Sequence, residues 1–205
     1  MTSGPTDSIY DPFLEKTISE AGHPKARAFG YSLANSVIDA FNENAFVASP
    51  EPTISFNALE VELGIENFML SIGTLLGVVD SSPQFHLMPP FIRYLSEVAF
   101  IQIGDATITG IPGELYPEIA VGGIENPQGA DFTIAPQEIP HLRGQLPGKL
   151  NLMVNLANDA IGYIIPKSEW DRDAPWIYGE NEETYGEVVS LGPNTAPIIL
   201  SLIHI

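Results

Sequence analysis

The chain has 205 residues, 44% of them hydrophobic and 17% charged, so it has enough apolar side chains for a packed core and does not resemble a disordered protein. It contains no cysteine, which excludes disulfides, thiolate metal sites and a cysteine nucleophile. Its formal net charge of −18 repels phosphate groups, so nucleic acid is not an expected partner.

The N-terminal part of the chain predicts one loop and one helix. Residues 1–22 are predicted to be a loop, and residues 1–7 have neither the basic head nor the apolar run of a signal peptide. A helix is predicted to begin at Pro24, which favours a first helical turn, and apolar residues recur at helical spacing as far as Phe41. We expect this amphipathic helix to cover a sheet.

The middle of the chain is rich in residues that favour strands. Residues 53–65 alternate between apolar and polar side chains, which predicts one or two half-buried strands, and residues 66–79 predict a short helix and a loop. Residues 98–103 and 106–111 flank the turn pair Gly104-Asp105 and predict a β-hairpin.

The C-terminal half alternates between irregular and regular stretches. Glycine and proline are frequent in residues 122–149, which predicts a long irregular connection, and residues 170–187 are predicted to be a second one. Strands are predicted at 150–156 and 160–165, and a last helix begins near Asn194. Strands outnumber helices and do not alternate with them, so we predict an α+β fold with a layered β-sheet core covered by helices.

Several common motifs are absent from the sequence. The longest nearly apolar run, Phe68–Val79, has 12 residues, whereas a bilayer crossing needs about 20, so no transmembrane segment is predicted. None of the four histidines has the HxH or HExxH spacing of a local zinc motif. There is also no GxSxG elbow, P-loop or GxGxxG motif.

Three short segments carry side chains suited to chemistry. Glu114 follows Pro112-Gly113 at the start of a predicted helix, where it can ligate a metal, act as a general base or simply favour the helix dipole. Tyr163 follows the turn-forming pair Asn158-Asp159 and is predicted to be a half-buried strand residue. Tyr185 lies in a turn-rich stretch and can donate a hydrogen bond to developing negative charge.

Taken together, these segments resemble one known family. In order and approximate spacing, they resemble the second half of the catalytic domain of the neutral/alkaline non-lysosomal ceramidase family, and residues 28–41 look like the helix that precedes these motifs there. The quoted pieces are Pro112-Gly113-Glu114, Asn158-Asp159 with Gly162-Tyr163, and Tyr185 with Gly192-Pro193-Asn194-Thr195.

The resemblance implies a zinc-dependent amidase that cleaves the N-acyl bond of ceramide, or of a related lipid amide, with a zinc-activated water. It implies that Glu114 and Tyr163 are metal ligands and that Tyr185 is a catalytic residue that assists at the scissile carbonyl. Members of the family are commonly exported or membrane-associated.

One part of the family's zinc site has no match in this chain. The family's two histidine ligands and an assisting arginine belong to a region upstream of the part resembled here. We therefore expect residues 1–205 to be a partial ceramidase-like catalytic domain, an incomplete half of a larger one. Because a catalytic zinc site uses three protein ligands, this chain alone is expected to bind zinc weakly and to be inactive. It is also expected to expose an apolar face.

Two other interpretations stay open at this point. A non-catalytic acidic binding or structural module, holding calcium, predicts Tyr163 in a core, Glu114 in solvent and clustered carboxylates in residues 180–187. A glycosidase predicts that Glu114 faces Asp159 or Glu118 across a cleft of about 5–10 Å. The positions of the Glu114 carboxylate and the Tyr163 hydroxyl distinguish the three.

Overall fold

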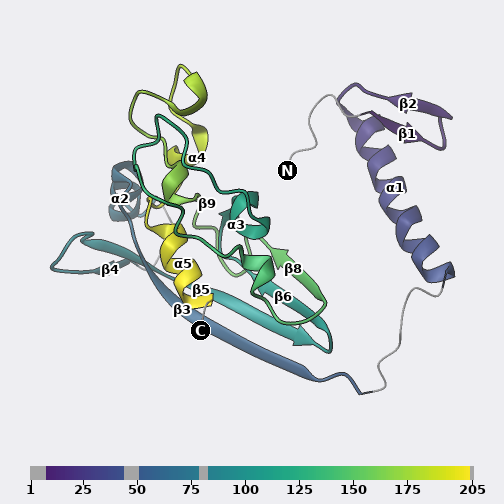
Figure 1. The fold of residues 1–205 in the computed structure, drawn as a ribbon, viewed down its shortest axis with the longest axis horizontal. Coiled ribbons are helices and arrows are strands. Elements are labelled where there is room, and N and C mark those ends of the chain that lie inside the picture. The colour runs from purple at the N-terminus through teal and green to yellow at the C-terminus, as the bar shows by residue number, and fades with distance from the viewer. Residues whose placement is uncertain (1–7, 44–50, 79–82, 204–205) are drawn as a thin grey trace. The chain divides into compact units, whose positions relative to one another are not determined.

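The computed structural model describes residues 8–43, 51–78 and 83–203 (Figure 1). The chain forms two compact units, Met1–Glu51 and Pro52–Ile205. In the described ranges, no helix is both long enough and apolar enough to cross a membrane.

The smaller unit consists of a hairpin and a helix. Strands β1 (Ile9–Asp11) and β2 (Lys16–Ile18) pair antiparallel, and helix α1 (His23–Asn42) packs against β1. The Asp11 carboxylate shapes the turn, because it accepts hydrogen bonds from the backbone of the next residues and from the Arg27 side chain at 2.9 Å. The predicted helix is confirmed. The predicted loop over residues 1–22 is wrong where the hairpin forms, and residues 1–7 lie outside the described residues.

A five-stranded sheet forms the centre of the larger unit. The main strand order is β3-β5-β6-β8, with β4 also paired to β5, and only the β6–β8 pairing is parallel. Gly104 forms the β5–β6 turn with a φ of +56°, which confirms the predicted hairpin. The strands are β3 (Ile54–Gly64), β4 (Pro83–Phe85), β5 (Ile92–Ile103), β6 (Ala106–Gly110) and β8 (Leu150–Val154).

A second, two-stranded sheet pairs β7 (Glu114–Leu115) with β9 (Tyr163–Ile164) in parallel. The strand predicted at 160–165 is shorter than expected, and it pairs with β7. The reason is that residues 106–115 and 150–164 run side by side in the same direction. Parallel neighbours need a long connection, and the irregular segment 122–149 supplies it.

Helices complete the larger unit and confirm the α+β prediction. Asn67 caps the short helix predicted in residues 66–79, and the predicted C-terminal helix packs on β3. The core between sheet and helices contains Val61, Leu63, Ile111 and Ile199. The helices are α2 (Phe68–Leu75), α3 (Pro117–Val121), α4 (Tyr185–Val188) and α5 (Thr195–Ile203), with 3-10 turns η1 (Leu142–Gly144), η2 (Lys167–Glu169) and η3 (Ile177–Gly179).

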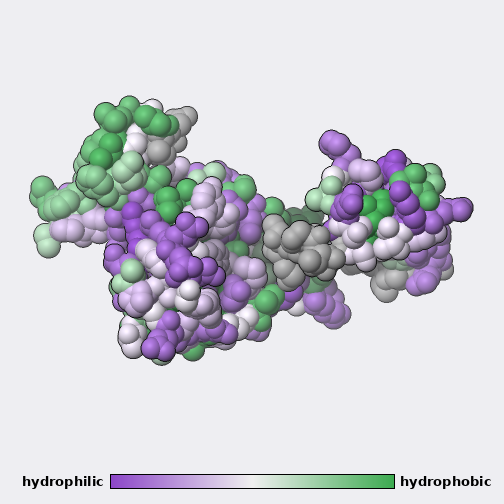
Figure 2. All heavy atoms as spheres, turned by 90° about the horizontal axis from the view of Figure 1, so that it is seen from above, coloured by the Kyte–Doolittle hydropathy of each residue, from purple (hydrophilic) through white to green (hydrophobic). Residues whose placement is uncertain are grey.

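Two surfaces of the larger unit are apolar. Strand register places one continuous apolar group, the outer sheet face, on the side opposite to Val61 and Leu63. It consists of Ile54, Phe56, Ala58, Ala99, Ile101, Ile103, Ala106, Ile108, Gly110, Leu150, Leu152 and Val154. The second surface lies over α2 and the β4–β5 turn, where Figure 2 shows apolar side chains gathered.

Candidate functional site

Glu114 and Tyr163 are direct neighbours across the β7–β9 pair. The Glu114 amide donates to the Gly162 carbonyl at 2.9 Å, and the register places Glu114 opposite Tyr163. The Glu114 carboxylate lies near enough to the Tyr163 hydroxyl to affect it: the pKa of Tyr163 is raised by burial first and by the Glu114 charge second. Glu114 therefore belongs to a strand and does not begin a helix as predicted. The acidic residue in the first turn of α3 is Glu118.

Two glycines allow the strands that carry this pair to approach each other and α4. Gly162 has a φ of +87°, and a Cβ there would collide with the Val189 carbonyl oxygen. A Cβ on Gly113 would collide with the Gly162 carbonyl oxygen. The Pro-Gly and Gly-Tyr pieces of the sequence therefore place the carboxylate and the phenol side by side.

Three tyrosines lie in a row beside the glutamate. The ring of Tyr163 makes edge-to-face contacts with Tyr116 on one side and Tyr185 on the other, each at a centroid distance of 6.1 Å. Tyr185 is the first residue of α4, and 69% of its surface is exposed. The structure thus brings together all three residues predicted for the site, Glu114, Tyr163 and Tyr185.

Two further residues of this region have no role assigned by the sequence. The Tyr116 hydroxyl packs on α4, where a Cβ on Gly186 would collide with it, and its pKa is raised by burial first and by Glu187 second. Glu187 is only 2% exposed, its Oε2 has no hydrogen-bond partner among the described residues, and burial raises its pKa to about 7. The sequence contains no signal for either, because both result from the packing of α4 against Tyr116.

The donor set at this site has two oxygen ligands for a metal, from Glu114 and Tyr163. A catalytic zinc site uses three protein ligands, so these residues do not complete one. In the part of the chain that the structure describes, no group of three or more His, Cys, Asp or Glu side chains is arranged to hold a metal ion.

The histidines in the described ranges do not belong to this pair. His86 Nε2 lies 2.5 Å from the Glu62 carboxylate, and His141 Nδ1 accepts from the Gly144 amide at 3.1 Å. His23 begins α1 in the smaller unit. His204 lies outside the described residues.

The carboxylates named by the other interpretations have different surroundings. Asp159 accepts from the Tyr94 hydroxyl at 2.8 Å and from the Ser96 hydroxyl at 2.9 Å, so it ties its loop to β5. Glu118 has a buried Oε2 with no hydrogen-bond partner among the described residues. In the acidic stretch 180–187, Glu183 pairs with Arg172 at 3.3 Å.

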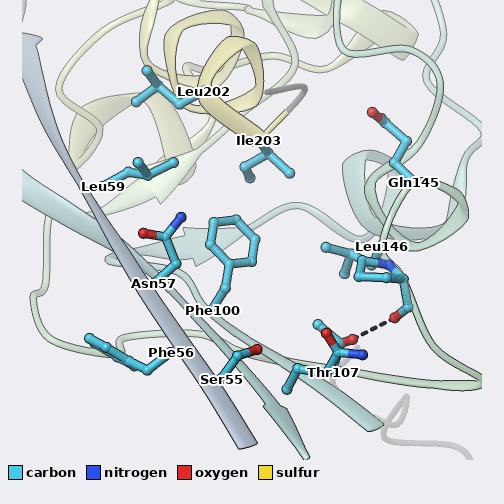
Figure 3. A pocket seen from close by; sticks show the side chains of 12 residues that line it. Ser55, Phe56, Asn57, Leu59, Phe100, Thr107, Gln145, Leu146, Leu202 and Ile203 are labelled. Carbon is cyan, nitrogen blue, oxygen red and sulfur yellow. Dashed lines mark hydrogen bonds between the residues drawn. The ribbon is translucent and has the colours of Figure 1, made fainter. Parts of the chain in front are cut away.

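A cavity of about 470 Å³ lies between the inner sheet face and the end of α5 (Figure 3). Figure 3 shows Phe100 at its centre, with Leu202 and Ile203 of α5 above it. Uncharged polar side chains such as Asn57 and Gln145 complete the lining, which contains no acid, base or cationic group. This cavity therefore offers no group for acid–base chemistry.

Comparisons of the chain with protein-family models, with curated proteins and with solved structures found no match. The geometry of Glu114, Tyr163 and Tyr185 and the sequence motifs that contain them are therefore the features from which a function can be inferred.

Proposed function

We propose that the chain carries the oxygen-donor part of a zinc-dependent amidohydrolase site that resembles that of neutral ceramidase and acts on ceramide or a related lipid amide. The observation that supports this proposal is the placement of Glu114 directly opposite Tyr163, with the Tyr185 ring in contact with the Tyr163 ring. The two oxygen donors come from segments about 50 residues apart in sequence and meet on one side of a parallel strand pair.

Each of the three side chains has a role that its position permits. The pairing of β7 with β9 keeps the Glu114 carboxylate and the Tyr163 hydroxyl close to each other, so both can contribute oxygen to one ligand. The exposed phenol of Tyr185 can donate a hydrogen bond to a carbonyl oxygen that gains negative charge. The remaining ligands, which in the family are two histidines, have to come from outside the described residues, so the proposal includes weak zinc binding and no turnover by this chain alone.

The geometry favours this proposal over the other two interpretations. An acidic module predicts Glu114 in solvent and Tyr163 in the core, but both are half-buried and lie opposite each other in the β7–β9 pair. A glycosidase requires a second carboxylate available across a cleft, and Asp159 already accepts hydrogen bonds from two hydroxyl groups.

Zinc titration calorimetry tests the proposal. We expect Glu114→Gln and Tyr163→Phe each to weaken zinc binding by at least about tenfold, because each variant removes one of two protein ligands. Glu182→Gln, which changes an exposed carboxylate elsewhere, serves as the matched control and should bind zinc like the parent. Unchanged zinc affinity in both site variants would contradict the proposal.

An amide-hydrolysis assay adds a second readout. Fatty acid released from a fluorescent N-acyl sphingosine is measured with zinc alone and with zinc plus millimolar imidazole, which replaces the missing histidine side chains. We expect no turnover with zinc alone, and any turnover restored by imidazole should be lost in Glu114→Gln. Imidazole-dependent turnover that survives this substitution would contradict the assignment.

A further inference from the structure

A second cavity of about 470 Å³ lies between two irregular segments of the larger unit, residues 125–129 and 175–179. Aromatic residues and prolines are among the residues that line it, and Glu125 is the one lining residue with a formal charge. The complete lining is Glu125, Pro127, Gln128, Gly129, Pro175, Trp176, Tyr178 and Gly179.

The walls of this cavity are held in place by specific contacts. Tyr178 has a φ of +54°, a conformation that bulky residues seldom adopt, and its hydroxyl donates to Glu125 Oε2 at 2.7 Å. The backbone of Glu125 is fixed as well, because its amide donates to Glu169 and its carbonyl accepts from Ser168 at 2.7 Å. A Cβ on Gly129 would lie 3.0 Å from the Trp176 carbonyl oxygen, so the two segments are closely packed.

The charge around the cavity is negative. Glu118 and Glu169 add their charges to that of Glu125 at the Tyr178 hydroxyl, whose pKa rises to about 12 mainly through its hydrogen bond to Glu125. Two basic residues of the adjoining segment have other partners. Lys167 donates to Asn194, and Arg172 pairs with Glu183. A cation is therefore attracted to this cavity and an anion is repelled.

We propose that this cavity binds the ammonium group of a small organic molecule, either a primary or an N-methylated amine. Glu125 supplies the opposite charge, and the rings of Trp176 and Tyr178 supply the electron-rich faces that attract such a group. The cavity volume lies in the range of small-molecule sites. A calcium ion needs six to eight oxygen ligands, which one carboxylate among aromatic and proline walls does not provide. The site is independent of Glu114 and Tyr163.

Tryptophan fluorescence of the full chain tests the proposal with choline as the probe. The chain has two tryptophans, and because Trp170 is only 4% exposed, Trp176 reports on the cavity. We expect a saturable change with choline chloride and at least about tenfold weaker binding of 3,3-dimethylbutan-1-ol, the uncharged carbon analogue of choline. Nα-acetyl-lysine methylamide, which carries a primary ammonium, measures whether a primary ammonium is preferred to the N-methylated ammonium of choline, and binding of either one supports the proposal.

Substitutions separate the contribution of the Glu125 charge to choline binding from the contribution of the apolar residues that line the cavity. Glu125→Gln should weaken choline binding by at least about tenfold and leave the uncharged analogue unaffected, whereas Glu182→Gln should change neither. Equal binding of choline and its carbon analogue, or unchanged choline binding by Glu125→Gln, overturns the proposal. Displacement of choline by millimolar calcium at constant ionic strength overturns it too, because it assigns the site to a metal ion.

A second variant keeps the test independent of the folding of Glu125→Gln. The Trp176→Leu variant removes the larger ring, and choline binding is then followed by line broadening of the choline methyl proton signals. We expect this broadening to be lost in the variant, and full retention of the broadening contradicts the proposal. Circular dichroism of each variant shows whether the fold is retained.

Discussion

Glu187 is deeply buried, one of its carboxylate oxygens has no hydrogen-bond partner among the described residues, and burial raises its pKa from 4.5 to about 7. The folded state therefore holds this proton over a pH range in which the unfolded state has lost it. As the pH rises from about 4.5 to 7, the free energy of unfolding falls by up to about 3 kcal/mol, and the loss is complete above the folded-state pKa.

This dependence can be measured by urea unfolding at a series of pH values. We expect Glu187→Gln, which cannot ionise, to lose less stability than the parent between pH 5 and 7.5. The comparison with the parent is necessary because Asp171 and Glu169 also have raised pKa values and act in the same direction. Parallel curves for parent and variant would contradict the assignment.

Asp11 predicts the opposite pH dependence for the smaller unit. Its hydrogen bond from Arg27 lowers its pKa, so its stabilising effect is present above the unfolded-state pKa and is lost as the pH falls through the folded-state pKa. We expect Asp11→Asn to increase amide hydrogen exchange in β1 and β2 at neutral pH, because the ion pair with Arg27 is removed. Exchange in β9, which belongs to the larger unit, serves as the internal control.

At the scale of elements, the β7–β9 pair needs glycine at position 162 for a steric reason that does not apply to a glycine in an open turn. Gly162→Ala combines a positive φ with a collision against the Val189 carbonyl, and we expect it to lower the free energy of unfolding by at least about 3 kcal/mol. Gly123 has a φ of +105° but no atom within 4 Å of a Cβ, so Gly123→Ala should cost only about 1–2 kcal/mol. Equal losses measured by urea unfolding would show that the collision is relieved.

The sequence predicts where helices and strands lie better than it predicts which strands pair with each other. The Gly104-Asp105 turn, the α1 helix and the α5 helix follow from spacing and turn chemistry within a few residues. The β6–β8 and β7–β9 pairings join segments more than 40 residues apart, and nothing in residues 150–165 alone shows which earlier strand they accompany. The β1–β2 hairpin was missed because the Asp11 side chain organises it and its strands have three residues each.

The same holds for the candidate site: residues within short motifs can be predicted from the sequence, but contacts between distant segments cannot. Glu114, Tyr163 and Tyr185 were singled out from motifs, and the structure places them in contact. The roles of Tyr116 and Glu187 could not be predicted, because they depend on the packing of α4 against Tyr116. The Trp176–Glu125 cavity likewise depends on two irregular segments whose sequences give no pairing pattern.

For the whole molecule, two opposing forces determine self-association. The outer sheet face is apolar across four strands, with Phe56 67% exposed, and flat sheet faces can stack on one another. Its footprint is roughly 15 Å on each side, on the order of 200–300 Å², which is well below the roughly 800 Å² per partner of a stable interface. The net charge of −18 opposes association through repulsion between copies.

We therefore expect weak association that increases with protein concentration and with salt, because salt screens the repulsion and leaves the apolar attraction in place. Sedimentation velocity at 20 mM and 500 mM sodium chloride measures this. The double variant Phe56→Thr with Leu152→Thr keeps the charge and the strand propensity, and it should remain monomeric at both salt concentrations. Leu76→Gln, on the α2 surface, is the control and should associate like the parent. Association that is lost in Leu76→Gln and kept in the double variant would assign the contact to the α2 surface instead.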